Sequence, residues 1–178
     1  MTDSIERVDR GHRQVVRRAR VAADAHDVFA LLANPHRHHE IDGSGTVKPQ
    51  VIGPRELRAG DKFRVSMQMH RIPYSLTSTA TEIVPDRVVE WRHPGKPRWR
   101  CAREPQDSGT TLVTGVFDYR LSPIADLLER VPRVLGGLLL RLDGAADFRE
   151  PVERLAAGLG LFGGKLVRKL IAPGEGLA

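Results

Sequence analysis

The side chains of this sequence that could do chemistry near neutral pH are mainly histidines. Three of the seven histidines, His36, His38 and His39, lie beside Glu40 and Asp42. A structural zinc site needs about four well-placed ligands, and the sequence offers no second cluster of suitable spacing. We therefore predict that this cluster forms an exposed segment between a helix and a loop, and we expect no metal and no cofactor.

Two other histidines, His70 and His93, fall at the ends of predicted strands. His93 shares its predicted face with Trp91, so it could point into the mouth of a cavity and act there as an acid or base. A histidine that is only hydrogen-bonded or solvated is the commoner alternative. The sequence has no Gly-rich phosphate loop, no GxSxG motif and no HExxH zinc motif, and no catalytic set can be assigned.

Arg103 and Tyr119 are the other polar side chains that strand alternation places on inward faces. Tyr119 shares a face with Phe117, which makes its hydroxyl available to orient a ligand. Arg103 shares a face with Trp99, and burial of its charge without a partner would be costly. We therefore expect Arg103 at the rim of the fold, or paired with Glu82 or with a carboxylate of a ligand.

The size and composition of the chain indicate one domain that positions these side chains. The length is 178 residues, and a 40% share of hydrophobic residues is enough for a sizeable core. The formal net charge of +6 permits contact with nucleic acid, anionic lipid or acidic ligands and selects none of them. Basic residues gather at 7–20 and 92–103, where we predict the solvated outer faces of strands.

Three features bear on the compartment. Cys101 is the only cysteine, which excludes an intrachain disulfide. The N-terminus carries Asp3, Glu6 and Asp9 and lacks the apolar run of a signal peptide. The longest apolar run, Val134–Leu140, has seven residues, whereas a membrane-spanning helix needs about 20. We expect a cytoplasmic protein.

Regular punctuation by Gly and Pro predicts an antiparallel meander after a first strand and two short helices. Asp24 can cap the first helix, which must end near Pro35, and one further turn is predicted at 36–41. The clearest strand is Asp61–His70, because its apolar side chains alternate strictly with polar ones. The predicted strands are Gln14–Ala22, Thr46–Ile52, Asp61–His70, Tyr74–Val84, Arg87–His93, the stretch around Trp99 and Cys101, and Thr110–Leu121.

A long amphipathic helix is predicted at Asp147–Phe162. Asp147 and Glu150 have the spacing of a capping box, and the glycines that follow Phe162 supply a stop. Residues 122–142 read as an apolar flap, and residues 166–178 as a basic, mobile tail. The apolar residues of the helix are spaced four and three apart on one face: Phe148, Val152, Leu155, Leu159 and Phe162.

The order of these elements resembles the helix-grip fold of the START-like (SRPBCC) superfamily, in particular its polyketide cyclase/dehydrase and lipid-transport branch. The resemblance covers about residues 12–165. It implies an α+β domain at 13–165, after a flexible N-terminus at 1–12, in which a curved antiparallel sheet of six or seven strands wraps around the C-terminal helix. It is carried by VAADAHDVFALLANPHRHHEIDGSG at 21–45, GDKF at 60–63, TEIVP at 81–85 with Glu90-Trp91, GTTLVT at 109–114 and FREPVERLAAGL at 148–159.

The resemblance implies a carrier or sensor that holds a hydrophobic ligand between the sheet and the C-terminal helix. The ligand would be a lipid, a polyketide or an aromatic compound, and the flap would gate access. A polyketide cyclase or dehydratase that uses the same cavity without a metal is the alternative. The residues predicted to line the cavity are Phe63, Val65, Met67, Met69, Ser78, Ala80, Trp91, His93, Trp99, Arg103, Phe117, Tyr119, Val152 and Leu155.

Two other classes of partner remain open at this point. Trp91 and Trp99 are interleaved with basic residues, as in proteins that stack nucleic-acid bases. If both tryptophans face inward, as alternation predicts, no stacking platform remains, and we therefore expect no nucleic-acid partner. Transient membrane contact through the leucine-rich flap and the basic tail is the other alternative. The sequence does not indicate an oligomeric state.

Overall fold

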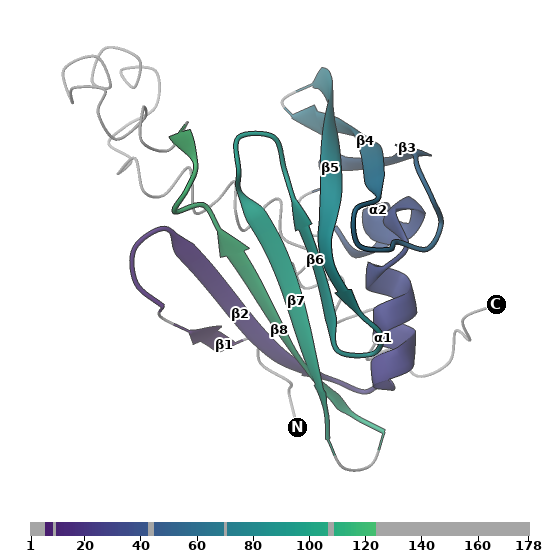
Figure 1. The fold of residues 1–178 in the computed structure, drawn as a ribbon. Coiled ribbons are helices and arrows are strands. Elements are labelled where there is room, and N and C mark those ends of the chain that lie inside the picture. The colour runs from purple at the N-terminus through teal and green to yellow at the C-terminus, as the bar shows by residue number, and fades with distance from the viewer. Residues whose placement is uncertain (1–5, 9, 43–44, 70, 107–108, 124–178) are drawn as a thin grey trace.

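The computed structural model describes residues 6–8, 10–42, 45–69, 71–106 and 109–123. In these ranges eight antiparallel strands form one sheet, in the order β1-β2-β8-β7-β6-β5-β4-β3 (Figure 1). The strands are β1 (Glu6–Val8), β2 (Gln14–Val21), β3 (Val47–Ile52), β4 (Lys62–Met69), β5 (Ile72–Val84), β6 (Val88–Arg92), β7 (Arg98–Pro105) and β8 (Thr111–Asp118). The helical segments are α1 (Ala25–Leu32), the 3-10 turn η1 (Pro35–Arg37) and α2 (His38–Ile41).

The helical segments carry the chain from β2 to the far edge strand, β3. Helix α1 packs on β6 and β7, whereas α2 and η1 contact β3. Val28, Leu31 and Leu32 form the predicted apolar face of α1, and all three are fully buried. Asp24 occupies the predicted N-cap position, although its side chain makes no capping hydrogen bond. The face of the sheet that α1 and α2 cover is called the inner face below.

Seven strands of the structure, β2 to β8, correspond to the strands predicted from the sequence. Strand β1 was not predicted, because three residues are too few to show an alternation. Its residues Glu6–Val8 belong to the segment expected to be a flexible N-terminus, and they pair with Val16–Arg18 of β2. Pairing with a neighbouring strand, which the local sequence does not reveal, is what defines β1.

A β-bulge in β5 changes which side chains face inward. The register passes from Ala80 opposite Trp91 to Glu82 opposite Glu90, so Thr81 is the extra residue. Strict alternation would have placed Glu82 on the inner face with Ala80. The bulge instead turns Glu82 to the outer face.

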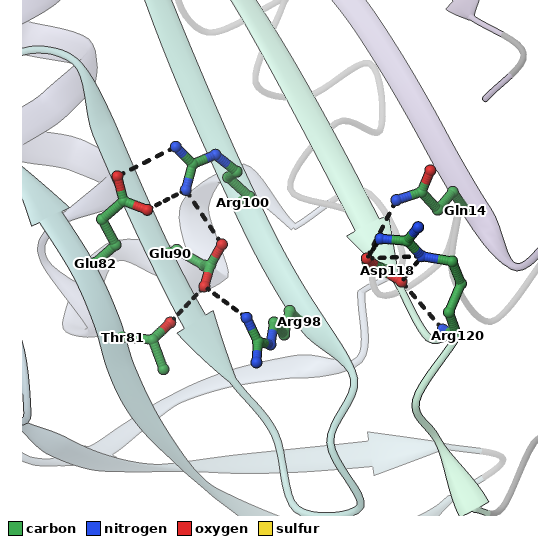
Figure 2. A network of polar contacts seen from close by, with 8 residues as sticks. All are labelled: Gln14, Thr81, Glu82, Glu90, Arg98, Arg100, Asp118 and Arg120. Carbon is green, nitrogen blue, oxygen red and sulfur yellow. Dashed lines mark hydrogen bonds and ion pairs between the residues drawn. The ribbon is translucent and has the colours of Figure 1, made fainter.

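Charged side chains of the outer face form a connected network (Figure 2). Arg100 binds both carboxylate oxygens of Glu82 and also donates to Glu90, with 3.2 Å between Arg100 Nη1 and Glu90 Oε2. Thr81 donates to Glu90 Oε1 at 2.8 Å, and Arg98 Nη1 lies 3.8 Å from that oxygen. The hydrogen bond from Arg100 lowers the pKa of Glu82. The basic stretch at 92–103 thus contributes Arg98 and Arg100 to an outer face, as predicted.

Several predicted elements lie outside the described residues. They are the helix at 147–162, all but the first two residues of the flap at 122–142, and the tail at 166–178. The described helices include none with both the length and the hydropathy needed to cross a bilayer.

Gly53, between β3 and β4, lies so close to Phe63 that it leaves no room for a side chain. Its φ is +148°, and a Cβ atom would lie 2.8 Å from Cβ of Phe63. We predict that Gly53→Ala lowers the free energy of unfolding by about 2–4 kcal/mol, because a strained backbone and a steric overlap act together. Urea unfolding followed by circular dichroism measures this loss.

Gly60→Ala is the matched control for this prediction. Gly60 also has a positive φ, +94°, but a Cβ atom there would meet nothing within 4 Å. Only the backbone strain applies, so we expect a loss of about 1–2 kcal/mol. Equal losses in the two variants would show that the approach to Phe63 has no energetic importance.

Candidate functional site

A pocket opens on the inner face between α2 and the strands β3 to β7. Its volume is about 40 Å³, which is room for a few water molecules, since one water needs about 10–15 Å³ on this measure. Drug-sized ligands occupy pockets of roughly 300 Å³ or more, so this pocket would hold one end of such a ligand. The lining residues are His38, Asp42, Val47, Phe63, Val65, Met67, Leu76, Ser78, Trp91, His93 and Trp99.

His38 closes the pocket on the helical side. Its ring stacks on Trp91, with the ring centroids 5.1 Å apart, and meets Phe63 edge-on at 5.9 Å. Nε2 lies 2.9 Å from the carbonyl oxygen of Leu32, the last residue of α1. A carbonyl can only accept a hydrogen bond, so Nε2 carries the hydrogen. Burial lowers the pKa of His38 to about 4, and the ring is therefore neutral at pH 7.

His93 and Ser78 form a polar pair on the opposite side of the pocket. Ser78 is 1% exposed, and its Oγ lies 2.8 Å from Nδ1 of His93. The pairing of Thr79 with Arg92 brings these two residues together where β5 and β6 run side by side. Burial, with a smaller contribution from His38, lowers the pKa of His93 to about 4. The pocket thus contains two uncharged imidazoles among apolar side chains.

Asp42 ends α2 and contributes the pocket's carboxylate. Its side chain is 2% exposed, and Oδ2 accepts a hydrogen bond from the backbone N–H of Val47 at 2.9 Å. This bond joins the end of α2 to the first residue of β3. Asp42 thereby fixes the turn that places His38 over the sheet.

A row of aromatic rings continues the inner face beyond the pocket. Trp99 stacks on Phe117 with a centroid distance of 4.5 Å, and Phe117 stacks on Tyr119 at 5.5 Å. The prediction that Tyr119 faces inward with Phe117 is confirmed by this contact. Trp91 and Trp99 are 3% and 4% exposed, so neither forms a stacking platform for bases. The two tryptophans that suggested nucleic-acid binding are therefore not accessible to bases.

Arg103 lies at the other end of the inner face, beneath α1. It is 3% exposed, and its guanidinium carbon lies 4.8 Å from the ring centroid of Phe29. The sequence-based expectation of Arg103 at the rim or paired with Glu82 was wrong on both points. The bulge in β5 sends Glu82 to the outer face, where it binds Arg100. Of the two partners considered for Arg103, only a ligand carboxylate is left open by these contacts.

The predicted cavity residues divide into three groups. Phe117, Tyr119, Arg103 and Ala80 lie on or beside the inner face without lining the pocket, and Ala80 is fully buried. The side chain of Met69, together with Val152 and Leu155, lies outside the described residues. The predicted residues that do line the pocket are Phe63, Val65, Met67, Ser78, Trp91, His93 and Trp99.

The pocket also contains residues that sequence reasoning missed or misplaced. His38 was expected to be exposed with its neighbours His36 and His39, but it is 5% exposed and faces Trp91. The spacing of His38, Ile41 and Asp42 is the signal that could have revealed this, since residues three and four apart share a helix face. Ile41 and Asp42 are both fully buried. The described residues contain no group of three or more metal-binding side chains suited to hold an ion.

The two buried histidines predict an acid-sensitive fold. Each pKa is about 4 in the folded chain against an ordinary value of 6.5, so the unfolded chain binds more protons between these values. The free energy of unfolding should therefore fall as the pH is lowered from about 6.5 to 4, by on the order of 1 kcal/mol per pH unit for each histidine. Urea unfolding at a series of pH values measures this slope.

Substitution of both histidines provides the control. The variant carrying His38→Gln and His93→Gln should lose most of the slope in this pH window. His26→Gln, at an exposed histidine bonded to Asp86, should retain it. An unchanged slope in the double variant would contradict the assignment of acid sensitivity to the pocket.

Comparison with known proteins shows the fold of the described residues but not a function. No family model matches the chain. An uncharacterized protein of Mycobacterium tuberculosis strain H37Rv, Rv0088, is 44% identical over 112 residues, which are 63% of this chain and 50% of that protein. The chain thus spans about half the length of the curated relatives it matches.

Two crystal structures share the arrangement of sheet and helices at low sequence identity. A Rhodobacter sphaeroides protein has a TM-score of 0.57 at 17% identity, over 71% of this chain and 85% of that one. The protein Ms6760 from Mycobacterium smegmatis has a TM-score of 0.56 at 15% identity, over 92% and 99% of the two chains. At this identity the two neighbours show the fold alone, which in this chain is an antiparallel sheet with two short helices inserted after its first long strand.

Proposed function

We propose that this protein binds a hydrophobic small molecule on the inner face of its sheet, as a carrier or sensor. The observation that carries the proposal is the pair of neutral, buried histidines in a pocket otherwise made mainly of aromatic and aliphatic side chains. Ligand sites commonly combine apolar walls with a few polar groups that fix orientation. His38, Ser78 and His93 supply such groups here.

The chemistry of these groups restricts the part of the ligand that enters the pocket. Neutral imidazoles and a serine hydroxyl can donate or accept hydrogen bonds but carry no charge at pH 7. They fit a hydroxyl, a carbonyl or a phenol. The apolar remainder of the ligand would lie against the apolar side chains of the inner face.

Catalysis by the same site is the alternative, and the spread of polar groups gives it little support. Arg103 pairs with Val113 of β8, six residues from Tyr119, which corresponds to about 20 Å along a strand. His93 is engaged with Ser78. An enzyme of this kind would have to use the His93–Ser78 pair without Arg103 and Tyr119 acting together.

Ligand binding can be measured directly, because both tryptophans of the chain, Trp91 and Trp99, line the pocket. We expect a long-chain alcohol such as dodecanol to change the tryptophan emission in a saturable way. Extraction and mass spectrometry of compounds that copurify with the protein from its own host would identify the natural ligand. An emission that no hydrophobic probe changes would contradict ligand binding on the inner face.

Filling the pocket tests its location. Ser78→Leu places a larger apolar side chain in a 40 Å³ pocket, and we expect it to weaken dodecanol binding at least about tenfold, with a loss of about 1–3 kcal/mol in stability from overpacking. Thr77→Leu is the control, since Thr77 precedes Ser78 in β5 and is exposed on the opposite face. Equal affinities in the two variants would place the ligand elsewhere.

A further inference from the structure

Arg103 is a charged side chain of the inner face for which the described residues supply no hydrogen-bond partner. Nε, Nη1 and Nη2 are all shielded from solvent, and none has a hydrogen-bond partner. A buried, unpaired charge costs several kcal/mol. Without a partner, an arginine in this position would therefore destabilise the fold.

The carboxylates of the described residues do not serve as that partner. Glu82 and Glu90 are bound by Arg100 on the outer face. Asp86 is the nearest acidic influence on Arg103, but its Oδ1 is bonded to Nδ1 of His26 at 3.0 Å near the surface. Arg103 has no ion pair within 4.0 Å to any described residue.

The neutral neighbours of Arg103 do not compensate its charge either. Cys101 precedes it on the inner face of β7, and burial raises the pKa of the Cys101 thiol to about 12, so the sulfur is protonated at pH 7. Burial lowers the pKa of Arg103 only to about 10, and the guanidinium stays charged. Phe29 covers one side of the guanidinium through a cation–π contact, which orients the group without neutralising it.

We propose that Arg103 binds the carboxylate of the hydrophobic ligand, so that the ligand is an amphipathic monocarboxylic acid. A guanidinium presents two parallel N–H groups that match a carboxylate. A single negative charge neutralises a single guanidinium, whereas a doubly charged phosphate would leave one charge unpaired in apolar surroundings. This inference rests on the proposed binding of a hydrophobic molecule at the inner face.

The position of Arg103 sets the orientation and length of such an acid. Arg103 and Trp99 lie on the same face of β7, four residues apart, which corresponds to about 13 Å along the strand. Because Arg103 lies outside the 40 Å³ pocket, a ligand held by Arg103 at one end would reach the pocket beside Trp99 only if the side chains that cover this path move apart. There His93 and Ser78 would meet a hydroxyl or carbonyl at that end, if the ligand carries one.

The test compares two probes of equal chain length, dodecanoate and dodecanol, by tryptophan emission of the full chain. We expect the wild type to bind dodecanoate at least about tenfold more tightly than dodecanol. Arg103→Met, which keeps a long unbranched side chain and removes the charge, should lose this preference while still binding dodecanol. Arg100→Met, on the outer face, should retain the preference.

The outcomes separate this inference from the function on which it rests. Equal binding of the two probes by the wild type, or a preference that survives in Arg103→Met, would overturn the role of Arg103 and leave hydrophobic binding intact. Binding of neither probe would overturn both. Equal binding of the two probes by the wild type overturns the role of Arg103 even if Arg103→Met fails to fold.

Thermal melting adds a readout that does not depend on a ligand. If Arg103 lacks a partner in the free protein, Arg103→Met should melt at a higher temperature than the wild type, because an uncompensated buried charge has been removed. Dodecanoate should then raise the melting temperature of the wild type and not that of the variant. A large loss of stability in Arg103→Met, together with no preference for the acid, would mean that a carboxylate elsewhere in the chain pairs with Arg103.

Discussion

The contact of His38 with α1 and with the sheet is the interaction on which the rest of the inner face depends. The ring makes three contacts: Nε2 donates to the carbonyl of the last residue of α1, and the ring stacks on Trp91 and meets Phe63 edge-on. Asp42, one helical turn later, ties the same segment to β3. Together these contacts hold two short helices against a sheet, although a helix of four residues has almost no stability of its own.

Charged side chains form ion pairs on the outer face of the sheet, whereas the histidines of the inner face are neutral. On the outer face, Glu82, Glu90, Arg98 and Arg100 each lie beside an oppositely charged neighbour. On the inner face, the histidines remain compatible with apolar surroundings by losing their protons. An arginine cannot do this at any ordinary pH. Arg103 therefore stays charged inside the protein and needs a negatively charged or hydrogen-bonding partner there.

The sequence predicted most of the fold because the sheet is built from local patterns. Alternating strands separated by Gly and Pro gave seven strands in the right places, and the order of elements indicated the START-like fold. Sequence reasoning failed where a tertiary contact overrides the local pattern. Strand β1 exists through pairing with β2, and His38 is buried because Trp91 and Phe63 lie opposite it in space.

Only part of the pocket was predicted, because local patterns reveal the strand residues but not the helical ones. Residues within regular strands, such as Phe63, Val65 and Trp99, could be assigned to a face by counting. Asp42 and His38 belong to a single helical turn, which is too short to show a period. The error at Glu82 has a different origin, since one extra residue in β5 reverses the count beyond it.

That extra residue, Thr81, also determines how the length of β5 can vary. Removal of Thr81 alone would straighten the strand and leave Glu82 outside and Ile83 inside, because these residues already face as an unbulged strand would place them after Ala80. Removal of a residue between Thr77 and Ala80 would instead exchange the inner and outer faces of the strand on one side of the gap. In the middle of β5, a residue can thus be deleted without exchanging the inner and outer side chains only at the bulge.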